Sequence, residues 1–197
     1  QEATLHALEH GFKLRNVFDA VKEITSRVNT PVLVMTYWNP VLQYGVERFA
    51  ADLAAAGGAG LITPDLIPDE AKLWLDASDK YGLDRVFLAA PTSTTERFAT
   101  AANLSRGFVY AVSTMGITGA REELDNLARS VVSGVRAADS EQLTCVGIGI
   151  STAEQVAEVN EYADGAIVGS VFVKTYAEGG LEALKVKVQQ LASNLAR

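Results

Sequence analysis

The sequence has a single cysteine, Cys145, among its 197 residues, so no disulfide bond can form within the chain. It has no CxxC pair and no cysteine and histidine residues at the spacing of a zinc site. Cys145 falls in the apolar stretch 143–147, where we interpret it as a small buried core residue in a reducing compartment. Because no signal peptide is recognisable, we expect a cytoplasmic protein.

Long hydrophobic runs and an excess of basic charge are also missing. No apolar run approaches the ~18 residues of a membrane helix, so we expect no membrane span. Lysine and arginine number 17 against 24 aspartate and glutamate, a formal net charge of −7, and we expect no nucleic-acid partner. Glycine and proline, at 16 and 5, are near average, which excludes collagen and low-complexity chains. An anionic substrate would therefore need local groups to hold it.

Short apolar runs alternate with amphipathic ones along the chain. Runs typical of strands buried on both faces of a parallel sheet lie at residues 32–36, 60–63, 86–89, 108–112, 144–147 and 166–168. Helical periodicity marks residues 17–28, 46–56, 69–81, 95–103, 122–138, 152–162 and 181–195. This alternation predicts repeated βα units, and therefore an α/β fold.

The first residues favour one of two architectures for six βα units, an eight-stranded barrel over an open doubly wound sheet. Leu5 and Leu8 recur at helical spacing in a run that Gly11 ends, so a helix precedes the first strand. In a strand–helix repeat, that helix would follow a strand absent from the sequence, which opens without methionine. We therefore predict a single (βα)8 TIM barrel domain over residues 1–197 that lacks its first two strands, with an upstream part missing.

Glycines follow the last two predicted strands. Gly147 and Gly149 surround the end of the fifth strand, and Gly169 and Ser170 open a helical turn after the sixth. Ser151 is a candidate helix N-cap. Backbone N–H groups at a helix start bind phosphate without a basic side chain, and barrels often place a phosphate site after their last two strands. The alternative interpretation is that these glycines make tight βα turns.

Groups for acid–base chemistry are scarce at the strand ends. Asp84 and Asp164 precede predicted strands, and Asp65 directly follows one. His6 and His10 stand four residues apart without an evident third metal ligand, so we interpret them as exposed helix residues. No Ser-His-Asp set and no Cys-His pair can be assembled. The chain therefore looks better equipped to bind a substrate than to move protons.

Two further features could belong to a binding site. Tyr37 and Tyr110, with Met35, could line an apolar pocket of aromatic size, although core packing explains each of them as well. Residues 116–119 combine glycines with hydroxyls and could form a mobile lid or an ordinary βα loop. Lys174 is interpreted as a surface charge.

Five segments together resemble the tryptophan synthase alpha chain family, in the order and at about the spacing of that family. They are residues 35–40, 64–66, 113–121, 146–151 and 168–170. The resemblance runs over the whole chain and implies a (βα)8 barrel that cleaves indole-3-glycerol phosphate to indole and glyceraldehyde 3-phosphate. It also implies an α2β2 complex with a beta chain that receives the indole through a tunnel. The pyridoxal phosphate would belong to that beta chain, so no cofactor is expected here.

The resemblance assigns roles to single positions of this sequence. The phosphate contacts of the family fall on Gly119, Ile148, Gly149, Gly169 and Ser170. Tyr37 and Tyr110 match the tyrosines of the substrate pocket, and Thr118 matches the lid threonine. Asn39 and Pro40 match the stretch that contacts the partner, and Asp65 matches an aspartate that signals between subunits.

Two departures from the family pattern limit the expected activity. Ile148 stands where the family usually has phenylalanine, which changes the pocket shape but leaves backbone binding of phosphate intact. The two catalytic carboxylates, a glutamate ending the second strand and an aspartate in the following loop, would lie before Gln1. The retro-aldol reaction needs a proton delivered to the indole ring carbon and one removed from the glycerol hydroxyl. We therefore expect the 197 residues alone to bind phosphate without turnover.

Two other functions stay open at this point. The chain could be a catalytically dead phosphate-binding module that activates a partner. It could also be another phosphate-binding barrel enzyme, such as an isomerase. An isomerase would share the phosphate loops but not the segments 37–40 and 116–119 together.

Overall fold

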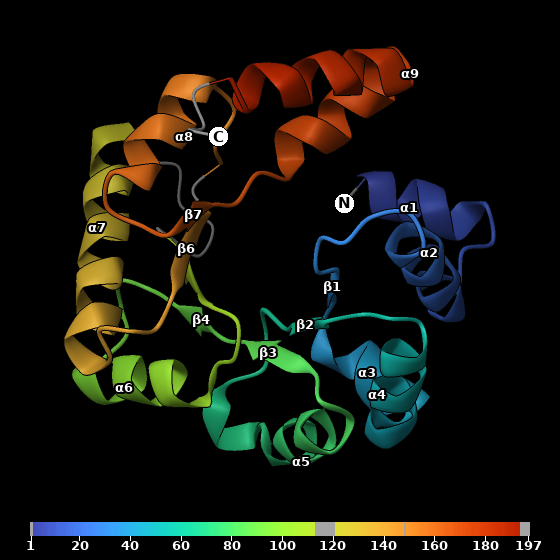
Figure 1. The fold of residues 1–197 in the computed structure, drawn as a ribbon, viewed down its shortest axis with the longest axis horizontal. Helices are drawn as coiled ribbons and strands as arrows, with labels where there is room; N and C mark the ends of the chain where they lie inside the picture. Colours follow the sequence, from blue (N-terminus) through green and yellow to red (C-terminus); the bar gives the residue numbers. More distant parts are fainter. Residues whose placement is uncertain (1, 113–120, 148, 194–197) are drawn as a thin grey trace. The chain divides into compact units, whose positions relative to one another are not determined.

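The computed structural model describes residues 2–112, 121–147 and 149–193 (Figure 1). Its backbone contacts divide the chain into two compact units, which are described separately. Unit 1 comprises residues 1–88 and 104–107, and unit 2 comprises residues 89–103 and 108–197. Within the described residues the strands pair in parallel and alternate with helices, as the α/β prediction requires. The prediction that residues 1–197 form a single domain stays a prediction.

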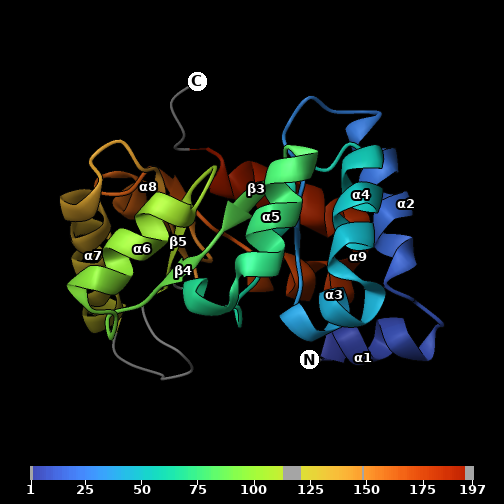
Figure 2. The ribbon, with the colours of Figure 1, turned by 90° about the horizontal axis from the view of Figure 1, so that it is seen from below.

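Unit 1 contains a three-stranded parallel sheet in the order β1-β2-β3. Its elements are α1 (Glu2–Glu9), α2 (Arg15–Thr25), β1 (Leu33–Met35), α3 (Trp38–Tyr44), α4 (Val46–Ala55), β2 (Gly60–Ile62), the short 3-10 helix η1 (Pro68–Glu70), α5 (Lys72–Tyr81) and β3 (Asp84–Val86). Helices α4 and α5 pack side by side, as Figure 2 shows, and bury Phe49, Leu53 and Trp74 completely. Burial of these large side chains is the main source of stability in this unit.

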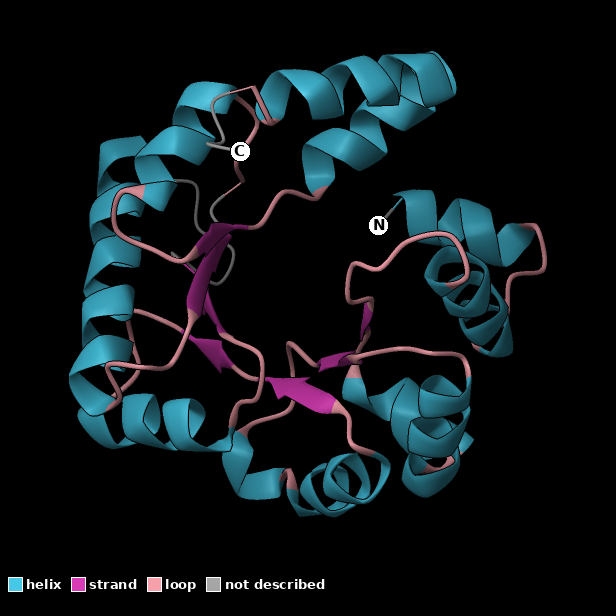
Figure 3. Cartoon of the chain, viewed as in Figure 1, coloured by secondary structure: helices cyan, strands magenta, loops and turns pink. Residues whose placement is uncertain are grey.

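Unit 2 contains a four-stranded sheet in the order β4-β5-β6-β7. Its elements are β4 (Leu88–Ala89), α6 (Thr95–Leu104), β5 (Val109–Val112), α7 (Arg121–Ala138), β6 (Thr144–Gly147), α8 (Ala153–Asn160), β7 (Gly165–Ala166) and α9 (Ser170–Leu191). The boundary between the units falls within β4 and at the end of α6. Helices α6, α7 and α8 lie on one side of the strands, which are magenta in Figure 3.

The two faces of the β5–β6 pair differ in burial. Val109 and Ala111 of β5, like Thr144 and Val146 of β6, are buried, on the face against which the helices pack. The alternate residues, including Tyr110 and Gly147, are only half-buried. Since successive side chains of a strand point to opposite faces, this alternation gives the sheet one buried face and one half-buried face.

The structure confirms most predicted elements and corrects others. The predicted helix 69–81 is η1 followed by α5, and the predicted strand 166–168 is β7, at Gly165–Ala166. The predicted strand 86–89 is two strands, β3 and β4, separated by Phe87. The predicted helix 181–195 is the second part of α9, which begins at Ser170 and bends at Gly180 (φ 68°, ψ −162°). Helix α3 was not predicted at all, because Pro40 suggests a loop. Pro40 occupies the third helical position, where the N–H has no partner within the helix, so the proline is tolerated.

The predicted cap of α8 is also corrected. Thr152, and not Ser151, is the N-cap, because its side chain accepts a hydrogen bond from the Gln155 N–H at 3.3 Å. The Gln155 side chain accepts in return from the Thr152 N–H, which completes a capping box. Gln155 Oε1 also accepts from the Ser151 N–H at 2.7 Å, so Ser151 contributes mainly its backbone.

No helix among the described residues is long and apolar enough to cross a membrane.

Thr152→Ala lowers the free energy of unfolding by about 1 kcal/mol, the usual cost of removing a threonine N-cap. Ser151→Ala is the matched control and costs less, since its backbone N–H still reaches Gln155. Urea unfolding followed by circular dichroism measures both. Equal losses in the two variants, or a larger loss in Ser151→Ala, would contradict the assignment of Thr152 as the cap.

Candidate functional site

The carboxyl edge of the β6–β7 pair brings two of the predicted glycine turns to one place. Cys145 and Val146 of β6 pair in register with Gly165 and Ala166 of β7, and the Ile167 N–H donates to the Val146 carbonyl oxygen at 2.8 Å. Gly149 and Gly169 each stand three residues beyond the last registered pair. Because the strands are parallel, both turns leave the sheet at the same edge.

The conformation of Gly149 leaves its backbone exposed. Gly149 has a φ of +71°, a left-handed conformation that side chains rarely adopt. It is exposed, and a Cβ atom at this position would meet no heavy atom within 4 Å. The backbone of Gly149 is therefore accessible to a ligand.

The N-terminus of α9 lacks a side-chain cap. Its N-cap is Gly169, which is exposed and has no heavy atom within 4 Å of a Cβ position. The Phe172 and Val173 N–H groups donate to the Gly169 carbonyl oxygen at 2.9 and 3.2 Å. The N–H groups of Ser170 and Val171, which precede them in the chain, have no acceptor within the helix, as is usual for the first N–H groups of a helix. Such groups carry partial positive charge and suit a phosphate.

Tyr110 lies across Gly147 on the half-buried face of the sheet. A Cβ atom at Gly147 would come within 2.7 Å of Cε1 and 2.8 Å of Cζ of the Tyr110 ring, a distance that real Cβ atoms do not reach. The absence of a side chain at Gly147 thus makes room for the ring. Burial raises the pKa of the Tyr110 hydroxyl above its ordinary value, so the group stays protonated at neutral pH.

Four of the predicted residues lie in unit 1, around the start of α3. Tyr37 is the N-cap of α3 and is 65% exposed, Asn39 is exposed and Pro40 is half-buried. Asp65, in the loop after β2, accepts hydrogen bonds from the Trp38 N–H at both carboxylate oxygens, at 2.8 and 3.1 Å. An acidic side chain suits the positive end of a helix. Asp65 thereby joins the loops that follow β1 and β2.

Three predicted residues, Thr118, Gly119 and Ile148, lie outside the described residues.

The remaining candidates have structural roles. Asp164 accepts from the Thr144 N–H at 2.8 Å and faces Arg136 at 3.5 Å. Cys145 is only half-buried, because it lies on the face of β6 opposite to Val146, so the expectation of a buried core residue is wrong. Partial burial, with a smaller effect of the Asp164 charge, raises the pKa of its thiol to about 11, which keeps it in the unreactive protonated form. Lys174 is exposed and pairs with Glu178 at 3.9 Å, which confirms its interpretation as a surface charge.

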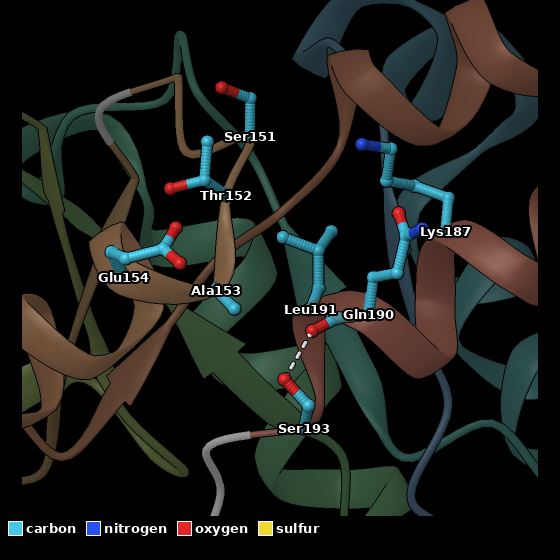
Figure 4. Close-up of a pocket in the computed structure, with 8 residues that line it drawn as sticks. All are labelled: Ser151, Thr152, Ala153, Glu154, Lys187, Gln190, Leu191 and Ser193. Atoms are coloured by element: carbon cyan, nitrogen blue, oxygen red, sulfur yellow. Dashed lines mark hydrogen bonds between the residues drawn. The ribbon is translucent and has the colours of Figure 1, made fainter.

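A cavity of about 390 Å³ lies between the start of α8 and the end of α9 (Figure 4). Its lining residues are Ser151, Thr152, Ala153, Glu154, Lys187, Gln190, Leu191 and Ser193. At the end of α9, the Ser193 hydroxyl donates a hydrogen bond to the Gln190 carbonyl oxygen, on one side of the cavity. None of the predicted site residues lines this cavity, so it is not the predicted substrate site.

A sequence model of the tryptophan synthase alpha chain matches residues 1–197. This chain belongs to the tryptophan synthase alpha chain family. It is 62% identical to the tryptophan synthase alpha chain of Leifsonia xyli subsp. xyli over 197 residues, which are 100% of this chain and 74% of that protein. The alpha chain of Mycobacterium marinum is 53% identical over 195 residues, 99% of this chain and 71% of the relative.

Solved structures of tryptophan synthase have the same fold. A Mycobacterium tuberculosis tryptophan synthase superimposes with a TM-score of 0.90 and 50% identity, over 98% of this chain and 72% of that one. A mutant alpha-subunit from Pyrococcus furiosus superimposes with a TM-score of 0.87 and 36% identity, over 98% and 79%. The fold class of this chain is thus the TIM barrel of the tryptophan synthase alpha chain family, of which it spans about three quarters.

Two contacts of candidate residues, one in each unit, could not be predicted from the sequence. The contact of Tyr110 with Gly147 and the bonds from Trp38 to Asp65 join residues distant along the chain. The available signal for the first was a glycine inside a predicted strand, which often marks a close approach.

Gly147→Ala destabilises the chain by about 1–3 kcal/mol, the usual cost of overpacking, because the new methyl group displaces the Tyr110 ring. Ser140→Ala, at an exposed residue in the turn before β6, is the control, and its effect stays within about 0.5 kcal/mol. Urea unfolding measures both. A Gly147→Ala variant as stable as Ser140→Ala would show that the ring does not occupy this space.

Asp65→Ala speeds hydrogen exchange at the Trp38 amide by about fivefold, the factor for losing a hydrogen bond worth ~1 kcal/mol. Asp69→Ala, an exposed carboxylate in η1, is the control and leaves this amide unchanged. Exchange followed by amide NMR reports the rate at this one group. Protection of Trp38 that survives in Asp65→Ala would rule out the bond.

Proposed function

We propose that this chain carries the alpha reaction of tryptophan synthase, the cleavage of indole-3-glycerol phosphate to indole and glyceraldehyde 3-phosphate in tryptophan biosynthesis. The match of the family over residues 1–197 supports this lyase function. The same match disfavours the alternative of an isomerase.

We propose that main-chain N–H groups hold the substrate phosphate. The open N-terminus of α9 supports this, because Gly169 and Ser170 present N–H groups with no side-chain cap. Gly149, at the same edge of the sheet, supplies a second accessible turn, and the resemblance adds Gly119 and Ile148. A chain with a net charge of −7 can bind a dianion in this way, since the attraction comes from local dipoles.

We propose that Tyr110 borders the indole part of the substrate. Its ring lies on the half-buried face of the sheet that also carries Gly147, below the edge with the glycine turns. A neutral phenol and its apolar ring suit a flat aromatic ligand. Tyr37 is assigned to the same pocket, and Thr118 to the lid, from the family resemblance.

The cleavage breaks the bond between the indole ring carbon and the glycerol chain. The ring carbon gains a proton, and the adjacent hydroxyl of the glycerol loses one as it becomes the aldehyde. Asp65 is suited to a positioning role in this scheme, because both of its oxygens accept from the Trp38 N–H. That the two proton-moving carboxylates lie before Gln1 stays a prediction, as does the absence of turnover by these 197 residues alone.

The proposed partner is a tryptophan synthase beta chain, in an α2β2 complex that channels indole. Pyridoxal phosphate is assigned to that beta chain and not to this one. We propose that Asn39 and Pro40 contact the partner. Asp65 would transmit the contact, because it holds the N–H of Trp38, which directly precedes Asn39.

Ser170→Asp weakens the binding of glycerol 3-phosphate by about 2 kcal/mol, through repulsion of the phosphate and distortion of its main-chain donors. Ser140→Asp adds the same charge in the turn before β6, at the opposite end of that strand, and serves as the matched control. Isothermal titration calorimetry measures both. Equal affinities in Ser170→Asp and Ser140→Asp would refute the phosphate site, and binding of a beta chain tests the partner separately.

A further inference from the structure

Helix α1 presents two histidines on one exposed face. His6 and His10 stand four residues apart, the spacing that places side chains one above the other on a helix. Their rings stack with centroids 4.2 Å apart and planes inclined by 28°. Both residues are exposed, and α1 has no buried residue. The two imidazoles are therefore neighbours that no core contact requires.

A hydrogen bond fixes the chemical form of one ring. Nδ1 of His10 lies 2.7 Å from the carbonyl oxygen of His6. Because a carbonyl oxygen only accepts, Nδ1 carries the hydrogen, and the lone pair of the neutral ring is on Nε2. A backbone carbonyl that binds one ring nitrogen in this way is the usual outer-shell partner of a metal-ligating histidine.

We propose that His6 and His10 form a two-histidine site for a divalent transition-metal cation such as Zn²⁺, Ni²⁺ or Cu²⁺. Imidazole nitrogen suits these cations, and two histidines four residues apart on one helix face hold zinc in other proteins. The described residues contain no group of three histidine, cysteine, aspartate or glutamate side chains around a common centre. Water therefore completes the coordination, and the site is open.

The metal links two successive turns of α1. Helix α1 has 8 residues and buries none of them, and a helix of this length is marginal by itself. A ligand that binds the helical form and not the unfolded form stabilises the helix by mass action. Metal binding is therefore expected to increase the helical signal of this segment. The inference is independent of the proposed function.

The test is titration of the untagged 197-residue chain with NiCl₂ by isothermal titration calorimetry, beside His6→Ala, His10→Ala and Glu9→Gln. The three residues are exposed, and alanine and glutamine both favour helices, so these variants keep the fold. One metal per chain is expected, with affinity at least about tenfold lower in each histidine variant, since even loss of an outer-shell partner costs that much. Glu9→Gln is expected to bind as the original chain does.

Three outcomes would overturn the proposal. They are no binding to the original chain, loss of affinity in one histidine variant alone, and one metal bound per two chains.

Discussion

The open N-terminus of α9 is the feature on which this account depends. Helices α8 and α9 follow the neighbouring strands β6 and β7 of one parallel sheet, and only α8 has a side-chain cap. A capping box pairs the N–H groups of Thr152 and Gln155 at the start of α8, whereas α9 begins at Gly169 and Ser170 without a side-chain cap. The first N–H groups of α9 have no acceptor within the helix, and we propose that the substrate phosphate accepts from them. A protein with a net charge of −7 can therefore bind phosphate without a basic cluster.

The parallel sheet brings the main-chain groups of Gly149 and Gly169 to the same edge. Parallel pairing of β6 with β7 sends both following turns to one edge, and the alternation of side chains leaves one face half-buried below it. On that face Gly147 admits the Tyr110 ring, so the polar edge and the aromatic side chain belong to one unit. In the other unit, Asp65 joins two strand-end loops by a similar main-chain contact, with the carboxylate as the acceptor. Backbone N–H groups at a helix start thus matter in both units: that of Trp38 binds Asp65, and those at the start of α9 are the proposed phosphate donors.

Patterns that depend on burial could be predicted from the sequence, and contacts that depend on tertiary structure could not. The strand at residues 144–147 was predicted to the residue, because a short apolar run has few alternatives inside an α/β fold. Helix α3 was not predicted because proline is typical of loops, and α3 contains Pro40. The cap of α8 was predicted at Ser151 and not at Thr152 because both residues carry a hydroxyl and both are good N-caps. Glycines marked the turns at Gly149 and Gly169. Gly147, a glycine inside a predicted strand, signalled a close approach, but its partner Tyr110 lies on another strand and could not be identified from local sequence.

The most direct measurement is the amide NMR spectrum of this chain during titration with glycerol 3-phosphate. Chemical shifts report on each N–H group separately, so they distinguish the open helix start from the capped one. The account predicts the largest shifts at Gly149, Gly169, Ser170 and Val171, with Gln155 unchanged. Shifts centred on the α8 cap, or spread over exposed lysines with none at the start of α9, would contradict it.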